Sequence, residues 1–207
     1  MIPKFIYFNF PFWRAEVGKI ALFMGNIEFE DIKVEFDEFA RLKKTGNLDD
    51  GTPIPFHQLP CLVFNGQSIA QTGGIARLCG KLGGIYPDDY LLAAQTDQFL
   101  DFATDITNLV FYTGRDLDEK SKKECRRKIS DGELLAKLEL LEKNLSAHNK
   151  WVIGNQIGLA DIAVWRLMGW LSGGILDGIP ETILDPFPRI KRLCIAVDSH
   201  ELVVDWV

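Results

Sequence analysis

The stretch from Leu59 to Thr72 constrains the fold of this chain more than any other part of the sequence. Pro60 restricts the residue before it to extended geometry, and it cannot donate to the ladder of a central strand. A short apolar run then leads to Asn65-Gly66, which is the strongest short-range signal for a hairpin. Helical spacing of apolar residues begins after Thr72, which stands at the predicted N-cap. The stretch therefore predicts a hairpin followed by a helix, and the free N–H groups of such a helix start attract small anions.

The residues before this hairpin predict two strands that alternate with two helices. Aromatic and β-branched residues favour strands at 4–8 and 28–34, and helical spacing favours helices at 12–25 and 37–45. Together with the hairpin and its helix, the predicted order is β-α-β-α-β-β-α. A segment rich in glycine, at 83–89, is the predicted linker.

Everything after the linker predicts helices, at 88–114, 118–148, 159–171 and 187–200. The leucine repeat of the second of these is too short for a confident coiled coil, so a helix of a bundle is expected. At the third helix, Asp161 can reach back to the backbone N–H of Gly158 and cap the helix start. The predicted domains are an α/β domain at 1–83 and an all-α domain at 90–207.

The composition excludes several classes of function. The net charge of −6 argues against a general nucleic-acid binder, because neutralising phosphates needs a basic surface. The apolar stretch 157–176 is broken by Asp161 and Arg166, so no membrane span is predicted. The four cysteines show neither metal-ligand nor redox spacing, and the first residues hold no long apolar signal region. A cytoplasmic protein without a metal is expected.

Three stretches, in this order along the chain, resemble the cytosolic glutathione transferases. They are Tyr7-Phe8-Asn9 with Arg14-Ala15-Glu16, the Pro60 hairpin with Gln71-Thr72, and the run from Gly154 to Asp161. The resemblance covers nearly the whole chain and is greatest to the sigma class, which includes glutathione-dependent prostaglandin D synthases. It implies a thioredoxin-like N-terminal domain, an all-helical C-terminal domain, and glutathione as co-substrate.

By this resemblance, Tyr7 is the main catalytic candidate, with Arg14 beside it. A free thiol has a pKa of about 8.5, and lowering it by roughly two units requires about 2.7 kcal/mol of differential stabilisation. One hydrogen bond to a charged group contributes about 1.5–3 kcal/mol, so a single tyrosine hydroxyl is nearly sufficient. The alternative is a tyrosine that only packs at the end of a strand. Tyr7 and Arg14 are seven positions apart, against six in the family, and Trp13 stands where glycine is usual, so the loop is expected to bulge.

The resemblance also implies a glutathione site in the N-terminal domain. Gln71 and Thr72 match the pair that holds the γ-glutamyl carboxylate, although Thr72 could be an ordinary N-cap. Leu59 would present its backbone to the cysteinyl unit, as a strand adds to an edge, if the bond to Pro60 is cis. The remaining candidates for this site are Gln58, Lys43, which could instead be a solvated charge, and Phe39, which stands where a tryptophan is usual.

Asp105 matches the carboxylate that reaches the glutathione of a second subunit, so the resemblance implies a homodimer. Asp97, Asp101 and Asp105 recur every four residues and share one helix face, which could equally be a solvated acidic face. A small hydrophobic electrophile is the implied second substrate. The residues expected to line its pocket are Phe8, Phe12, Trp13, Leu109 and Tyr112.

The resemblance therefore predicts transfer of glutathione to an electrophile. Two alternatives stay open. One is a glutathione-dependent isomerase, and the other is a non-catalytic binding or structural protein on the same fold, like the lens crystallins of cephalopods. A disulfide oxidoreductase is disfavoured, because no cysteine lies at the start of the first helix.

Overall fold

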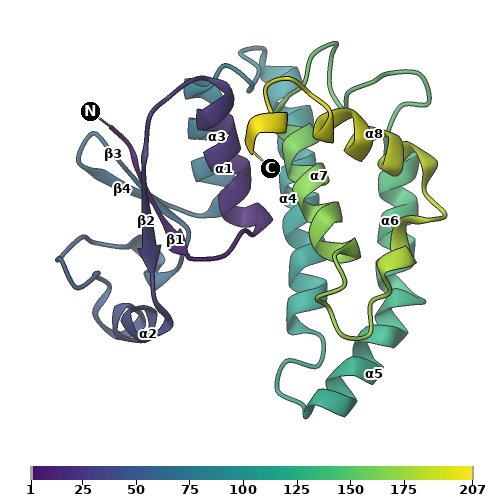
Figure 1. Cartoon of the computed structure of the whole chain (residues 1–207), viewed down its shortest axis with the longest axis horizontal. Coiled ribbons are helices and arrows are strands. Elements are labelled where there is room, and N and C mark those ends of the chain that lie inside the picture. The colour runs from purple at the N-terminus through teal and green to yellow at the C-terminus, as the bar shows by residue number, and fades with distance from the viewer. Residues whose placement is uncertain (1, 207) are drawn as a thin grey trace. The chain divides into compact units, whose positions relative to one another are not determined.

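The structure is a computed structural model that describes residues 2–206 (Figure 1). It contains two compact units. The first comprises the chain up to Pro87 together with Trp206, and the second runs from Asp88 to Asp205.

The first unit is built on a four-stranded sheet with the order β2-β1-β3-β4. Strand β1 (Lys4–Phe8) pairs in parallel with β2 (Glu30–Val34), and helix α1 (Trp13–Met24) makes the crossover between them. Strand β3 (Cys61–Phe64) is antiparallel to both β1 and β4 (Gln67–Ala70). This topology, with the helices on its faces, is the predicted thioredoxin-like order, and the prediction is confirmed.

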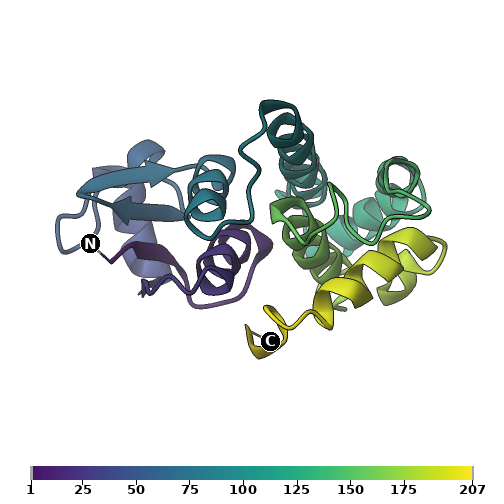
Figure 2. The same ribbon diagram turned by 90° about the horizontal axis from the view of Figure 1, so that it is seen from above.

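Helices cover both faces of this sheet (Figures 1 and 2). Helices α1 and α3 (Thr72–Leu82) pack together on one face, and α2 (Phe36–Thr45) covers the other. Successive side chains of a strand point to opposite faces. Phe5 accordingly lies so close to α1 that a Cβ on Gly18 would be 2.8 Å from its ring, whereas Ile6 shares a core with Leu42 of α2. Phe5 and Ile6 of β1 therefore face opposite sides of the sheet.

The second unit is entirely helical. Its central helix is α7 (Leu159–Ser172), which is buried along most of its length and packs against α4 (Tyr90–Tyr112) and α8 (Pro188–Asp198). A helix that is apolar on nearly all sides belongs in the middle of a bundle. A short 3-10 turn lies in this unit at Glu181–Leu184, another at Pro55–His57 in the first unit, and a third, Val204–Trp206, where the chain returns to the first unit. Among residues 2–206, no helix is long and apolar enough to cross a bilayer.

The expected single helix at 118–148 is wrong, because two helices occupy this range. Helix α5 (Glu119–Ser130) ends at Asp131, and α6 (Glu133–Asn144) begins after Gly132. Gly132 has φ −130° and ψ −103°, which no helical residue adopts. The break lets α6 turn its own leucines inward, and Leu134, Leu138 and Leu141 are buried.

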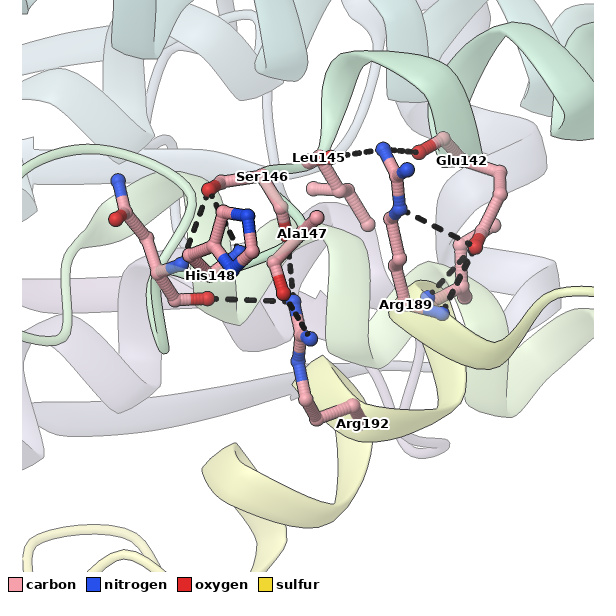
Figure 3. Close-up of polar contacts among 9 residues, drawn as sticks. Glu142, Leu145, Ser146, Ala147, His148, Arg189 and Arg192 are labelled. Carbon is pink, nitrogen blue, oxygen red and sulfur yellow. Dashed lines mark hydrogen bonds and ion pairs between the residues drawn. The ribbon is translucent and has the colours of Figure 1, made fainter.

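The first turn of α8 is capped by a side chain from another helix (Figure 3). The Glu142 carboxylate, on α6, accepts hydrogen bonds from the backbone N–H groups of Arg189 and Ile190, at 2.9 and 3.0 Å. In return, the guanidinium of Arg189 donates to the carbonyl of Leu145, and that of Arg192 donates to the carbonyl of Ala147, both at 2.8 Å. Each helix therefore satisfies free backbone groups at the end of the other.

Candidate active site

Tyr7 stands at the end of β1 and is almost fully buried, with 4% of its surface exposed. Its ring meets the rings of Phe8 and Phe10 edge to face, with centroids 5.2 and 5.8 Å apart. Burial raises the pKa of the Tyr7 hydroxyl well above its usual range, and Arg14 offsets only part of this rise, while Glu16 adds to it. The phenol therefore stays protonated at neutral pH and is available as a hydrogen-bond donor.

The loop between Tyr7 and α1 exposes the ring of Phe10 to solvent, whereas the indole at the start of α1 is buried. Phe10 is exposed, whereas Trp13, the first residue of α1, is 1% exposed. Phe12 is half-buried, and its carbonyl accepts the first helical hydrogen bonds, from the N–H groups of Ala15 and Glu16. The indole of Trp13 thus supports the loop from inside, and Phe10 and Phe12 are the loop aromatics that reach solvent.

The start of α3 differs by one residue from the prediction. Gln71 occupies the N-cap position and Thr72 is the first helical residue, so the assignment of Thr72 as N-cap is wrong. Gln71 has φ 70° and ψ 124°, and its side chain does not cap the helix. A positive φ is costly for a residue with a β-carbon, and such strain concentrates at functional sites. The exposed Gln71 amide and the half-buried Thr72 hydroxyl lie beside the first N–H groups of the helix.

The arm before β3 has the expected geometry. The Leu59–Pro60 peptide bond is cis, which is the condition on which the role of Leu59 depends. Ladder pairing of β3 begins at Cys61, so Leu59 precedes the paired residues. Gln58 is exposed and extended, with φ −136° and ψ 151°. The ring nitrogen Nδ1 of His57 lies 3.2 Å from the carbonyl oxygen of Lys43, which ties this arm to the end of α2.

Helix α2 contributes Phe39 and Lys43. Phe39 is half-buried against the core under α2, and its ring meets that of Phe8 at 5.0 Å. The Lys43 ammonium is exposed but lies 5.7 Å from the centre of the Phe39 ring, within cation–π range. The nearby Arg41 is instead paired with Asp49. Lys43 is therefore the basic residue of this helix that is held beside the aromatic residues.

Three of the predicted site residues lie on α4, in the second unit. Asp105 is exposed, Leu109 is half-buried, and Tyr112 is exposed near the end of the helix. The Arg115 guanidinium lies 5.7 Å from the centre of the Tyr112 ring. All three residues lie on the same helix.

Two aromatic residues that the sequence analysis did not single out belong to the same cluster. Phe10 stacks on Phe8 with an interplanar angle of 4° and centroids 5.5 Å apart, and Phe36 stacks on Phe8 at 27° and 5.2 Å. The available signal was the density of phenylalanine around Tyr7 and at the start of α2. Periodicity could not reveal the cluster, because a loop residue and a helix residue meet only in the folded chain.

The two buried cysteines of the first unit, Cys61 and Cys79, are poor nucleophiles. Burial raises the pKa of the Cys61 thiol to about 11 and that of Cys79 to about 12, so both stay protonated. Cys125 and Cys194 are also unpaired. Within residues 2–206, no group of three or more His, Cys, Asp or Glu side chains is arranged to hold a metal ion.

Comparison with known proteins agrees with this fold. Residues 3–78 match the family description "Glutathione S-transferase, N-terminal domain", and residues 101–207 match "Glutathione S-transferase, C-terminal domain". The chain is 31% identical to glutathione S-transferase P 10 of Caenorhabditis elegans, over 92% of this chain and 83% of that protein. It is 27% identical to hematopoietic prostaglandin D synthase of Mus musculus, over 99% and 94% of the two chains.

A solved structure shares the whole architecture. The monomeric glutathione S-transferase Na-GST-3 of Necator americanus superposes with a TM-score of 0.80 at 23% identity, covering 100% of this chain and 96% of that one. A thioredoxin-like domain followed by a helical domain, with these relatives, defines a glutathione-dependent class of enzyme. The chain belongs to the glutathione S-transferase family.

Proposed function

We propose that this enzyme conjugates the thiolate of glutathione to small hydrophobic electrophiles, with Tyr7 stabilising the thiolate. The observation that carries the proposal is the environment of Tyr7, whose buried hydroxyl stays protonated beside Arg14 at the end of β1. A neutral phenol is a donor that strengthens as its partner gains negative charge. It therefore favours the ionised form of a bound thiol over the neutral form.

The two carboxylates and the cysteinyl backbone of glutathione are held by residues of the first unit. The γ-glutamyl carboxylate is placed at Gln71 and Thr72, beside the free N–H groups of α3. The cysteinyl backbone is placed along Leu59. This residue is joined to Pro60 by a cis bond, and it lies outside the ladder because the pairing of β3 begins at Cys61. The glycyl carboxylate is placed near Lys43, with Gln58 and Phe39 beside it.

The reaction then needs no further nucleophile. The thiolate sulfur donates an electron pair to an electrophilic carbon, a carbon–sulfur bond forms, and the leaving group departs with the electron pair of the broken bond. The thiol proton is lost to solvent before the attack, so the charge balances. Phe8 and Phe12 are proposed to line the second-substrate pocket on the side of the first unit. Trp13 was expected to line it as well, but it is 1% exposed and can only support the pocket from behind.

A second candidate is a glutathione-dependent isomerase. It is favoured by the mouse prostaglandin D synthase, which the chain matches along 99% of its length. The two proposals share the thiolate and differ in the second substrate. Assays with chloronitrobenzenes and with a prostaglandin endoperoxide, each with glutathione, separate them, because only an isomerase returns glutathione unchanged.

We also propose a cytoplasmic homodimer with two composite sites, in which Asp105 reaches the α-amino group of the glutathione bound to the other subunit. An exposed carboxylate on α4 supports this assignment. The hookworm relative is named as monomeric, so a monomer is the alternative. The proposed function is tested by steady-state turnover of an electrophile with glutathione. Binding to glutathione resin without turnover of any electrophile or endoperoxide would overturn it and favour a binding protein.

A further inference from the structure

Two consecutive residues of the arm before β3 adopt left-handed backbone conformations. Phe56 has φ 60° and His57 has φ 51°, and neither is a glycine. A residue with a β-carbon is strained in this conformation, and such strain persists only where the surrounding structure holds it. The His57 side chain is exposed, so its burial is not what holds the arm in this shape. The contacts of its ring supply the reason.

The ring of His57 lies against the last residues of α2. Its Nδ1 is 3.2 Å from the carbonyl oxygen of Lys43, and because a carbonyl can only accept, Nδ1 carries the proton and donates the hydrogen bond. A Cβ built on Gly46 would stand 2.6 Å from Nε2 of the same ring, so the ring lies directly over the backbone of Gly46. The His57 ring therefore joins the arm to α2 at two points.

The two ends of the arm are fixed by other contacts. Gly46, at which α2 ends with φ 78°, donates its N–H to the carbonyl of Leu42 and accepts the N–H of Ile54, both at 2.8 Å. Ile54 and Leu42 are buried in the core under α2, and Leu59 packs against the same core. Between Ile54 and Leu59 the arm is largely exposed, and there the His57 ring links it to α2.

This link acts on the spacing of two contacts that are proposed for glutathione. Lys43, whose carbonyl holds the ring, is proposed to bind the glycyl carboxylate, and Leu59 is proposed to bind the cysteinyl backbone. From these contacts, and resting on the proposed function, we infer that His57 is a positioning residue that holds Lys43 and Leu59 at the spacing of the tripeptide. It thereby sets the preference for glutathione over γ-glutamylcysteine, the dipeptide that lacks the glycyl unit.

A ligand gains from a fixed spacing only if it engages both contacts. Glutathione engages Lys43 and Leu59 together, so an arm that is free to move would have to be ordered on binding, and the ordering would weaken the affinity. γ-Glutamylcysteine engages Leu59 but has no carboxylate for Lys43, so the distance between the two residues does not matter to it. Ionisation of the thiol belongs to Tyr7 on β1 and does not depend on this spacing.

Calorimetry with the two peptides tests the inference. Wild type should bind glutathione more tightly than γ-glutamylcysteine. Glycine adopts φ 51° without strain but has no ring, so His57→Gly should bind glutathione about three- to tenfold more weakly, the range of one hydrogen bond. Its affinity for the dipeptide should stay within about twofold of wild type. Asparagine tolerates the left-handed conformation and carries an N–H donor at the position of Nδ1, so His57→Asn should keep the wild-type preference.

A double-mutant cycle gives the second readout. Lys43→Ala removes the ammonium but leaves the carbonyl to which His57 donates. In this background His57→Gly should cause no further loss of affinity for glutathione, because no second contact remains to be positioned. The titration of thiolate absorbance should be the same in wild type and His57→Gly. His148→Gly, which removes an exposed histidine of the second unit, is the matched control and should leave both affinities unchanged.

The outcomes separate this inference from the proposed function. Equal losses for the two peptides in His57→Gly, or no loss for either, would overturn the inference and leave glutathione transfer standing. A loss in His57→Asn as large as that in His57→Gly, or additive losses in the cycle with Lys43→Ala, would overturn it as well. Failure of the wild-type protein to bind glutathione would instead contradict the proposed function. Urea denaturation verifies that each variant is folded under the conditions of the assay.

Discussion

At the scale of single residues, the environment of Tyr7 makes its hydroxyl a donor that cannot become a base near neutral pH. Burial is the main cause of the raised pKa of Tyr7, and the positive charge of Arg14 offsets only part of that rise. We therefore expect Tyr7→Phe to raise the pKa of bound glutathione by roughly one to two units, about 1.36 kcal/mol per unit. Turnover at neutral pH should fall by about one to two powers of ten and recover at higher pH. Thiolate absorbance against pH measures the shift. Superimposable curves would assign the thiolate to another donor.

The conformation of Gln71 gives a prediction that separates binding from stability. Gln71→Ala removes the amide and should weaken glutathione binding by about 1.5–3 kcal/mol, the size of a hydrogen bond to a charged group. Gln71→Gly should lose the same affinity and raise the free energy of unfolding above that of the alanine variant, because glycine adopts φ 70° without strain. Calorimetry and urea denaturation provide the two readouts, with Gln67→Ala as an exposed control. Full affinity in both Gln71 variants would remove Gln71 from the site.

At the scale of elements, the start of α7 depends on one buried carboxylate. Asp161 is fully buried, and its two oxygens accept the N–H groups of Val152 and Gly158, each at 2.8 Å. The predicted contact with Gly158 is confirmed. Burial raises the pKa of Asp161 to about 6 despite these hydrogen bonds, which lower it. The folded protein therefore keeps this proton at pH values at which the unfolded chain, with a pKa of about 3.9, has released it.

The sign of the resulting pH dependence follows from that difference. The contribution of Asp161 to the free energy of unfolding is greatest below about pH 4. It is lost as the pH rises to about 6, and the total loss is about 2–3 kcal/mol. Asp161→Asn cannot titrate. Urea denaturation of both proteins between pH 4 and 7 should show wild type losing stability relative to the variant over this window. Pairs such as Lys19–Asp31 occur in both proteins and cancel. A constant difference between the two curves would contradict the assignment.

The elements also show where reasoning from sequence succeeded. The order of strands and helices in the first unit followed from local signals, namely Pro60, Asn65-Gly66 and the spacing of apolar residues. The break at Gly132 was missed, because one glycine costs a helix only about 1 kcal/mol and does not by itself end it. The cap that Glu142 gives to α8 spans 47 positions, and no local pattern encodes it.

For the candidate site, the sequence predicted which residues to examine but not how the aromatic side chains around Tyr7 meet. The positions of Tyr7, Gln71 and the arm at Leu59 followed from family motifs, and their roles in glutathione binding stay predictions. Gln71 was not expected as the N-cap, because a glutamine side chain rarely caps a helix and the positive φ is visible only in the backbone. Phe10 and Phe36 were missed because their stacking is tertiary.

At the scale of the whole molecule, the chain passes between its two units twice, once after Pro87 and once after Asp205. After Asp205, the chain returns to the first unit, where the indole N–H of Trp206 donates to the Glu16 carboxylate at 2.9 Å and its ring packs on Phe23 at 5.3 Å. Glu16 is buried on α1, two residues from Arg14. Trp206 is therefore part of the fold of the unit that carries Tyr7.

A composite dimer makes a prediction that no single-chain site can reproduce. If Asp105 serves the glutathione of the other subunit, Tyr7→Phe and Asp105→Ala subunits should complement each other. In a hybrid dimer, the site built on the Asp105→Ala subunit keeps its own Tyr7 and receives Asp105 from the Tyr7→Phe subunit. An equal mixture after subunit exchange should regain about a quarter of wild-type activity, because about half the dimers are hybrids with one intact site of two.

The controls for this experiment are the two variants measured separately and a mixture that is never allowed to exchange, and all of these should stay near the low activity of the parents. Mass measurement at micromolar concentration establishes whether dimers form at all. If hybrids form without regaining activity while Asp105→Ala alone is impaired, Asp105 acts within its own chain. A monomer that binds glutathione with full affinity would instead show that the exposed carboxylates of α4 are a solvated face.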